Sequence, residues 1–217
     1  MTLWNDFVAY APDLFSGLGV SLRLTAFSLG LGFPLGLLLA LGMSSKKSVL
    51  RGTSIVLTEI GRGTPALVML QIVYFGLPAG GLTLTGFVSA GIAFALTTGA
   101  YSSEIIRGGL QSVPQGEVEA SEALGMSSVD TLRFILVPQG LRVAIPALMG
   151  FSILMFQATS LAYSIALPEL LSRAFTIGSA NFNYLSILTI AGLMYAAVTV
   201  PMSWLSGRAE KRLSRHV

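Results

Sequence analysis

The sequence predicts an all-α integral membrane protein with five membrane-spanning helices. Of its 217 residues, 53% are hydrophobic and only 11% are charged, and this composition is too apolar for a soluble domain. The chain is also too short for more than one membrane domain. The apolar residues lie in long runs without charge, and a helix needs roughly 20 such residues to cross about 30 Å of hydrocarbon. The basic residues lie mostly between these runs.

Five charge-poor stretches are long enough to be spans. The longest uncharged stretch, from Gly63 to Ser103, exceeds one helix. It is divided into two spans joined by a tight outer loop at the turn residues Gly76, Pro78, Gly80 and Gly81. We expect the spans to cover residues 15–43, 59–78, 86–106, 141–167 and 183–207.

Basic residues give the expected orientation, because Lys and Arg favour cytoplasmic loops. Arg23 and Arg173 are the exceptions. Arg23 either snorkels to the outer headgroups or faces a solute path, and Arg173 has the helical spacing to pair with Glu169. We therefore expect the N-terminus outside and the C-terminus in the cytoplasm. Eleven of the 13 basic residues fit this pattern: Lys46, Lys47, Arg51, Arg62, Arg107, Arg133, Arg142, Arg208, Lys211, Arg212 and Arg215.

Several kinds of site are excluded by composition. There is no cysteine, and the single histidine, His216, forms no cluster, so we expect no metal site. The acidic start, with Asp6 and Asp13, does not resemble a cleavable signal peptide, so the first span should remain in the mature protein. No Walker motif occurs, and no nucleic-acid partner is expected. Gly32 and Gly36 form a GxxxG step suited to close helix packing.

A polar segment, residues 112–138, interrupts the membrane spans. Four of the ten acidic residues lie between Glu117 and Asp130, so the segment must face water. Small residues at Ala120 and Ser121 would permit close contact with a partner. Two interpretations remain open, a docking surface and an amphipathic connector resting on headgroups. The pattern predicts two short helices, with a start at Ser112, a left-handed end at Gly125, a second cap at Ser127 and a stop at Pro138.

This polar segment resembles the EAA loop of bacterial ABC importer permeases. The matching residues are Glu119, Ala120, Ser121, Gly125, Ile135, Val137 and Pro138, with Ser121 in place of an alanine and Val137 in place of a leucine. The flanking stretches GAYSSEIIRGG and EIGRGTPALVMLQIVYFGLP are similar to those of the polar amino acid uptake permeases. The resemblance covers residues 14–213, nearly the whole chain.

The resemblance implies the type I ABC importer permease fold, with a cytoplasmic coupling helix that seats in a cleft of a separate ATPase subunit. ATP and Mg would bind in an ATPase dimer, and this chain would be a transport subunit, not an enzyme. The implied partners are a second permease, identical or paralogous, and an extracytoplasmic solute-binding protein at a bacterial inner membrane. The solute would be a polar amino acid, an opine or a related polar compound. The implied coupling residues are Glu119, Ala120, Ser121, Leu124, Gly125 and Met126.

Polar side chains inside the spans are candidates for the solute pathway. Gln157, Thr159 and Ser160 lie in a charge-free span, where they either bind a substrate or satisfy neighbouring helices. Many relatives of the resembling family carry a lysine where this chain has Gln157, which weakens the case for an anionic group held there. Two pairs with i,i+3 spacing, Glu59–Arg62 and Glu104–Arg107, are structural or gate-forming.

The alternative function is that of a self-sufficient secondary carrier or channel for small polar solutes. An ion-driven carrier would be expected to place acids within its spans. Residues 24–45 and 143–167 contain none. This absence favours the importer.

Overall fold

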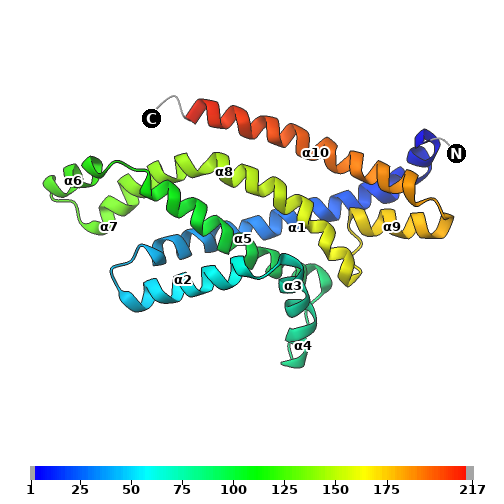
Figure 1. Cartoon of the computed structure of the whole chain (residues 1–217), viewed down its shortest axis with the longest axis horizontal. Helices are drawn as coiled ribbons and strands as arrows, with labels where there is room; N and C mark the ends of the chain where they lie inside the picture. The colour runs from blue at the N-terminus through cyan, green and yellow to red at the C-terminus, as the bar shows by residue number, and fades with distance from the viewer. Residues whose placement is uncertain (1–2, 214–217) are drawn as a thin grey trace.

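The chain forms an elongated helical bundle in the computed structural model, which describes residues 3–213 (Figure 1). None of these residues forms a strand, and the all-α prediction is confirmed. Arg215 and His216 lie outside the described residues. The helices are α1 (Leu3–Met43), α2 (Ser48–Gly63), α3 (Ala66–Gln71), α4 (Leu77–Ala79), α5 (Gly86–Gln111), α6 (Gln115–Ala123), α7 (Ser128–Asp130), α8 (Val137–Ala158), α9 (Leu170–Asn181) and α10 (Tyr184–Leu213). Two π-helical segments, Ile72–Gly76 and Thr131–Leu136, and a 3₁₀ helix, Thr159–Ile165, lie between them.

The buried core lies where α1, α5 and α8 meet, and it includes Leu24, Phe94 and Met155. A second cluster joins α1 to α9 and α10 through Leu14, Leu170 and Ile187. The remaining large apolar side chains are mostly exposed on the outside of the bundle. This is the distribution expected where lipid, and not water, surrounds the helices.

Helices α1 and α5 approach closely through glycine. A Cβ added at Gly32 would overlap the side chain of Thr98, and one at Gly36 would overlap Ser102 and lie 3.0 Å from the Gly99 carbonyl oxygen. Glycine permits this approach because it carries no side chain. The GxxxG step expected from the sequence is therefore a helix contact.

The second predicted span, residues 59–78, is not one helix. Helix α2 ends at Gly63, and the chain bends by 102° before α3 begins at Ala66. Thr64 is extended, with φ −89° and ψ 123°, because a residue that precedes proline avoids the helical region. The helical part also starts earlier than predicted, at Ser48. Gly76 and Pro78 stay within the helical path, and the turn falls at Gly80 and Gly81.

Pro138 does not stop a helix, contrary to the prediction. The helical path runs unbroken from Ser128 to Ile165. Pro138 lies in the first turn of α8, directly after the π-helical segment. A proline is tolerated there because the widened hydrogen-bonding pattern of the preceding turns does not require its missing N–H. The fourth span therefore has no loop between it and the polar segment.

Three continuous helical stretches are long and apolar enough to cross a membrane: Leu3–Met43, Ser128–Ile165 and Tyr184–Arg212. The bent pair of α2 with α3 and α4 adds a fourth when counted as one span. Helix α5 is long enough to cross a membrane but is less apolar than these stretches, because glycine, serine and threonine line its buried side. The number of five spans stays a prediction.

Segments predicted to face the cytoplasm gather at one end of the bundle, and α9 lies with the N-terminus at the other (Figure 1). The predicted Glu169–Arg173 pair is absent from the ion pairs of the described residues. Glu169 instead points into the bundle and caps α9. Arg23 is exposed, and its Nε donates to the Gly19 carbonyl at 3.1 Å.

Candidate functional site

The polar segment folds as two short helices, α6 and α7, beyond the end of the bundle (Figure 1). Helix α6 begins at Gln115 after Pro114, and not at Ser112 as predicted. Ser112 instead terminates α5, and its hydroxyl donates to the Gly109 carbonyl at 2.8 Å. Proline fixes φ near the helical value and so favours the start that follows it.

Gly125 ends α6 in the left-handed conformation, with φ +77°, as predicted. The Gly125 amide donates to the Glu122 carbonyl at 2.9 Å, and the Met126 amide donates to the Ser121 carbonyl at 3.1 Å. This pair of bonds is a Schellman motif, which satisfies the last carbonyls of the helix and fixes the exit direction of the chain. A Cβ at Gly125 would meet nothing within 4 Å. The requirement for glycine is therefore conformational and not steric.

Ser127 caps α7, as predicted. Its Oγ accepts a hydrogen bond from the Asp130 amide at 3.2 Å and donates to the Asp130 carboxylate at 2.6 Å. This reciprocal pair resembles a capping box and holds the first turn of α7.

Ser121 does not face a partner, contrary to the prediction. It is buried, and its hydroxyl lies 2.9 Å from the Thr131 hydroxyl across the turn. This contact, here called the Ser121–Thr131 clasp, joins α6 to the start of the long helix. Ala120 and Glu119 remain on the exposed side. The clasp and the Schellman turn together hold α6 against the start of the long helix.

Several apolar side chains project from the α6–α7 unit, and no other part of the described chain covers them. Leu124 is 82% exposed, and Val129 and Phe134 are exposed as well. Met126 is half-buried against the turn. Among the loop-end residues, Ile135 and Val137 are half-buried and Pro138 is exposed. Exposed leucine at a sharp, rigid turn is suited to insertion into an apolar socket on another protein.

The two predicted charge pairs both form, and they are connected. Arg62 lies 3.6 Å from Glu59 within α2 and 4.0 Å from Glu104 of α5. Arg107 donates from Nε to the Glu104 carboxylate at 3.1 Å. Tyr101 adds a hydrogen bond to the Arg62 carbonyl at 3.2 Å. The sequence spacing could not give the Arg62–Glu104 link, because it depends on how α2 packs against α5.

The three candidate pathway residues lie in different environments. Thr159 is fully buried, and its hydroxyl donates to the Phe156 carbonyl at 2.7 Å. Ser160 is half-buried and donates to the Gln157 carbonyl at 2.8 Å, whereas the Gln157 side chain is exposed. The structure therefore brings Thr159 into the packed interior and leaves Gln157 on an open face.

Two further polar residues lie near this region and were missed by the sequence analysis. Gln71 at the end of α3 donates from its amide to the Ser164 hydroxyl at 2.9 Å. The contact links the bent second span to the 3₁₀ helix that follows α8. Both residues are polar side chains within apolar runs, and this pattern could have indicated a contact between spans.

A buried carboxylate also lies here, at Glu169, which the sequence pattern indicated only as a partner for Arg173. Glu169 is 0% exposed, and its oxygens accept hydrogen bonds from the amides of Leu171 at 2.9 Å and Ser172 at 2.7 Å. The hydroxyl of Tyr195 donates to it at 2.9 Å, and that of Ser21 lies at 3.4 Å. This cluster, here called the Glu169 knot, joins α1, α9 and α10. An acid just after Leu-Pro and before an apolar run is the signal that could have indicated a helix cap.

Most of the chain, residues 32–215, matches the protein family described as "Binding-protein-dependent transport system inner membrane component". The chain belongs to this family of transport permeases. Membership makes it a multi-pass inner-membrane transport subunit, not an enzyme, in a family that works with ATPase and binding-protein partners.

Curated relatives align with this permease over nearly its whole length. The probable amino-acid ABC transporter permease protein YckA of Bacillus subtilis (strain 168) is 34% identical over 206 residues, which cover 95% of this chain and 91% of the relative. The L-cystine transport system permease protein TcyB of the same organism is 39% identical over 210 residues, covering 96% and 90%. The histidine/lysine/arginine/ornithine transport system permease protein HisM of Salmonella typhimurium is 36% identical over 225 residues, covering 99% and 94%.

Solved transporters share the fold of this permease. The crystal structure of an amino acid ABC transporter with histidines superposes with a TM-score of 0.88 at 32% identity, covering 95% of this chain and 97% of that chain. The MetNI methionine ABC transporter in inward-facing conformations gives a TM-score of 0.77 at 19% identity, covering 94% and 98%. The second similarity supports the fold alone.

Proposed function

We propose that this permease forms half of the translocation pathway of an ATP-driven importer for a polar amino acid or a related polar solute. Three relatives above 30% identity carry names of amino-acid permeases, and the structural neighbour at 32% identity is an amino acid ABC transporter. A second permease, identical or paralogous, completes the pathway. ATP and Mg bind in a partner ATPase dimer, and an extracytoplasmic binding protein delivers the solute.

The observation that carries the proposal is the rigid α6–α7 unit with its exposed leucine. Leu124 stands at the Schellman turn, where Gly125 sets the backbone direction and the Ser121–Thr131 clasp ties α6 to the start of the long helix. A flexible loop would absorb the motion of an ATPase subunit. A rigid unit of this kind passes that motion to the membrane helices as a rigid-body tilt.

The unit faces the cytoplasm in the proposed orientation, with the N-terminus outside and the C-terminus inside. The turn between α1 and α2, the α6–α7 unit and the end of α10 lie at one end of the bundle (Figure 1). This end also carries most of the basic residues, as the distribution of Lys and Arg in inner-membrane proteins requires.

Among the candidate pathway residues Gln157, Thr159 and Ser160, we propose that Gln157 contacts the solute. Its side chain is exposed, whereas Thr159 and Ser160 donate their hydroxyl hydrogens to helix carbonyls. An amide offers both a donor and an acceptor to a zwitterionic or polar solute and carries no charge. The Glu59–Arg62–Glu104–Arg107 chain joins α2 to α5 and has a structural or gating role.

Two substitutions in the α6–α7 unit test the proposal. Gly125→Val forces a β-branched residue into the left-handed region, at a cost of about 1 to 3 kcal/mol. Glu119→Lys reverses a charge on the exposed face. We expect both variants to reach the membrane at normal levels but to lose substrate-stimulated ATP hydrolysis or to release the ATPase subunit during purification.

Gly125→Asn is the matched control, because asparagine tolerates the left-handed conformation. It should retain coupling. Full transport and a stable ATPase complex in both Gly125→Val and Glu119→Lys would refute the coupling role. Uptake that persists without the ATPase subunit would instead support a secondary carrier.

A further inference from the structure

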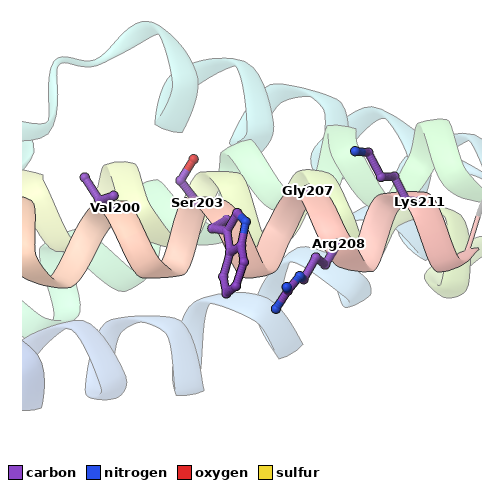
Figure 2. Close-up of a pocket in the computed structure, with 6 residues that line it drawn as sticks. Val200, Ser203, Gly207, Arg208 and Lys211 are labelled. Carbon is purple, nitrogen blue, oxygen red and sulfur yellow. The ribbon is translucent and has the colours of Figure 1, made fainter.

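A hollow of about 600 Å³ lies along the last turns of α10 (Figure 2). It is lined by Val200, Ser203, Trp204, Gly207, Arg208 and Lys211. Figure 2 shows α10 in front of the other helices, with Ser203 and Lys211 projecting to one side of the helix and Arg208 to the other. The hollow therefore opens to the surroundings of the bundle.

The lining residues form one stripe because they recur at helical spacing along α10. Gly207 is the floor of the hollow, and a Cβ there would meet nothing within 4 Å. Val200 and Trp204 at one end are 65% and 61% exposed and offer an apolar surface. Arg208 and Lys211 provide positive charge at the other end. One end thus suits acyl chains, and the other suits an anion.

Arg208 is pre-organised for an anionic ligand. Its guanidinium carbon lies 3.3 Å from the centroid of the Trp204 ring, so one face of the guanidinium is stacked. Stacking on the face leaves the N–H groups at the edge free to donate to phosphate oxygens. The Ser203 hydroxyl is a further donor on the same stripe.

The two cations are not neutralised within the described part of the chain. None of its ion pairs includes Arg208 or Lys211. Glu210 is exposed and does not line the hollow. An anion from outside the chain would therefore meet positive charge that no acid of the described residues pairs with.

Depth in the membrane identifies the anion. The predicted span ends near Gly207, so Trp204 lies at the hydrocarbon boundary, where tryptophan is favoured, and Arg208 and Lys211 lie among headgroups. We propose that the hollow binds the headgroup phosphate of an anionic phospholipid of the cytoplasmic leaflet, with the acyl chains along Val200 and Trp204. The leaflet rests on the orientation proposed above, whereas the site itself does not.

Fluorescence of Trp204 tests this site in the assembled transporter. The chain contains two tryptophans, so a Trp4→Phe background leaves Trp204, and the signal of a Trp204→Phe variant of that background is subtracted. The complex with its ATPase subunits is placed in bilayers containing brominated phosphatidylglycerol or brominated phosphatidylcholine at equal mole fraction. We expect phosphatidylglycerol to quench Trp204 more strongly.

Variants then separate charge from shape. Arg208→Gln or Lys211→Gln should weaken the preference for phosphatidylglycerol about fivefold, because each variant removes the attraction of one basic residue to anionic lipid. Gly207→Leu should abolish it by filling the hollow without changing charge. Arg212→Gln removes an exposed cation at the same helix end that does not line the hollow, and it should leave the preference unchanged.

Equal quenching by both lipids would refute headgroup recognition. Quenching by neither would show that a protein, such as the second permease, covers this face, and would also overturn the proposal.

Discussion

The Glu169 knot should be a major contributor to the stability of the end of the bundle that holds α9 and the start of α1. Glu169→Ala removes the side chain that caps α9, at a cost of about 1 kcal/mol. It also leaves the donors of Tyr195 and Ser21 without their carboxylate, at a cost of about 1 to 3 kcal/mol for each buried group. Allowing for the long Ser21 contact of 3.4 Å, the structure predicts a loss of about 3 to 5 kcal/mol.

Glu169→Gln separates the hydrogen bonds from the volume. The glutamine oxygen can take the place of Oε2, where the donors of Leu171, Tyr195 and Ser21 converge. Its NH₂ group then faces the Ser172 amide, which is also a donor. We expect an intermediate loss of about 1 to 2 kcal/mol for this variant. Asp13→Ala, which removes an exposed acid from α1, serves as the control and should change stability by less than about 0.5 kcal/mol.

The assay is thermal unfolding of the purified complex in detergent. For a chain of this length, the alanine variant should lower the midpoint by roughly 10 °C. A midpoint within about 2 °C of wild type would refute the reasoning, because the buried carboxylate would then not hold α1, α9 and α10 together. An equal loss for Gln and Ala would mean that the charge, and not the cap, carries the effect.

Three further predictions follow from the bundle. A cysteine at Thr83 should react with an impermeant thiol reagent in intact cells and one at Ser127 only after lysis; the reverse pattern would overturn the proposed orientation. Gln157→Leu should slow uptake while the complex assembles normally, and wild-type uptake rates would assign Gln157 to packing. Gly36→Val should cost about 1 to 3 kcal/mol by overpacking against Ser102 and lower the thermal midpoint, whereas Gly30→Val, which has open space, should not; equal midpoints would contradict the α1–α5 contact.

Features with local causes could be predicted from the sequence. Gly125 was found because a left-handed helix end favours glycine, and Ser127 because a capping residue and its acid lie three positions apart. The Gly32–Gly36 step was found because its spacing alone places both glycines on one helix face. The family resemblance supplied the coupling role, which no spacing could give.

Features that depend on the fold could not be predicted in the same way. Ser121 looks like a partner contact until the turn brings it onto Thr131, ten positions away. Glu169 has two of its four donors on α1 and α10, far away in sequence. The break before Pro65 is different, because its local signal was present in the sequence. Charge gives no sign of this break, because the stretch from Gly63 to Ser103 around it carries none.

The helical path from Ser128 to Ile165 has a mechanical consequence. Its 38 residues would measure about 57 Å at the rise of an α-helix. The Ser121–Thr131 clasp grips one end of this rod, and Gln157 and Ser164 lie toward the other. A tilt of about 5° applied at the clasp would displace the far end by about 5 Å, roughly the height of one helical turn. A small tilt at the clasp is thereby amplified with distance along the helical path, so the end that carries Gln157 and Ser164 moves furthest.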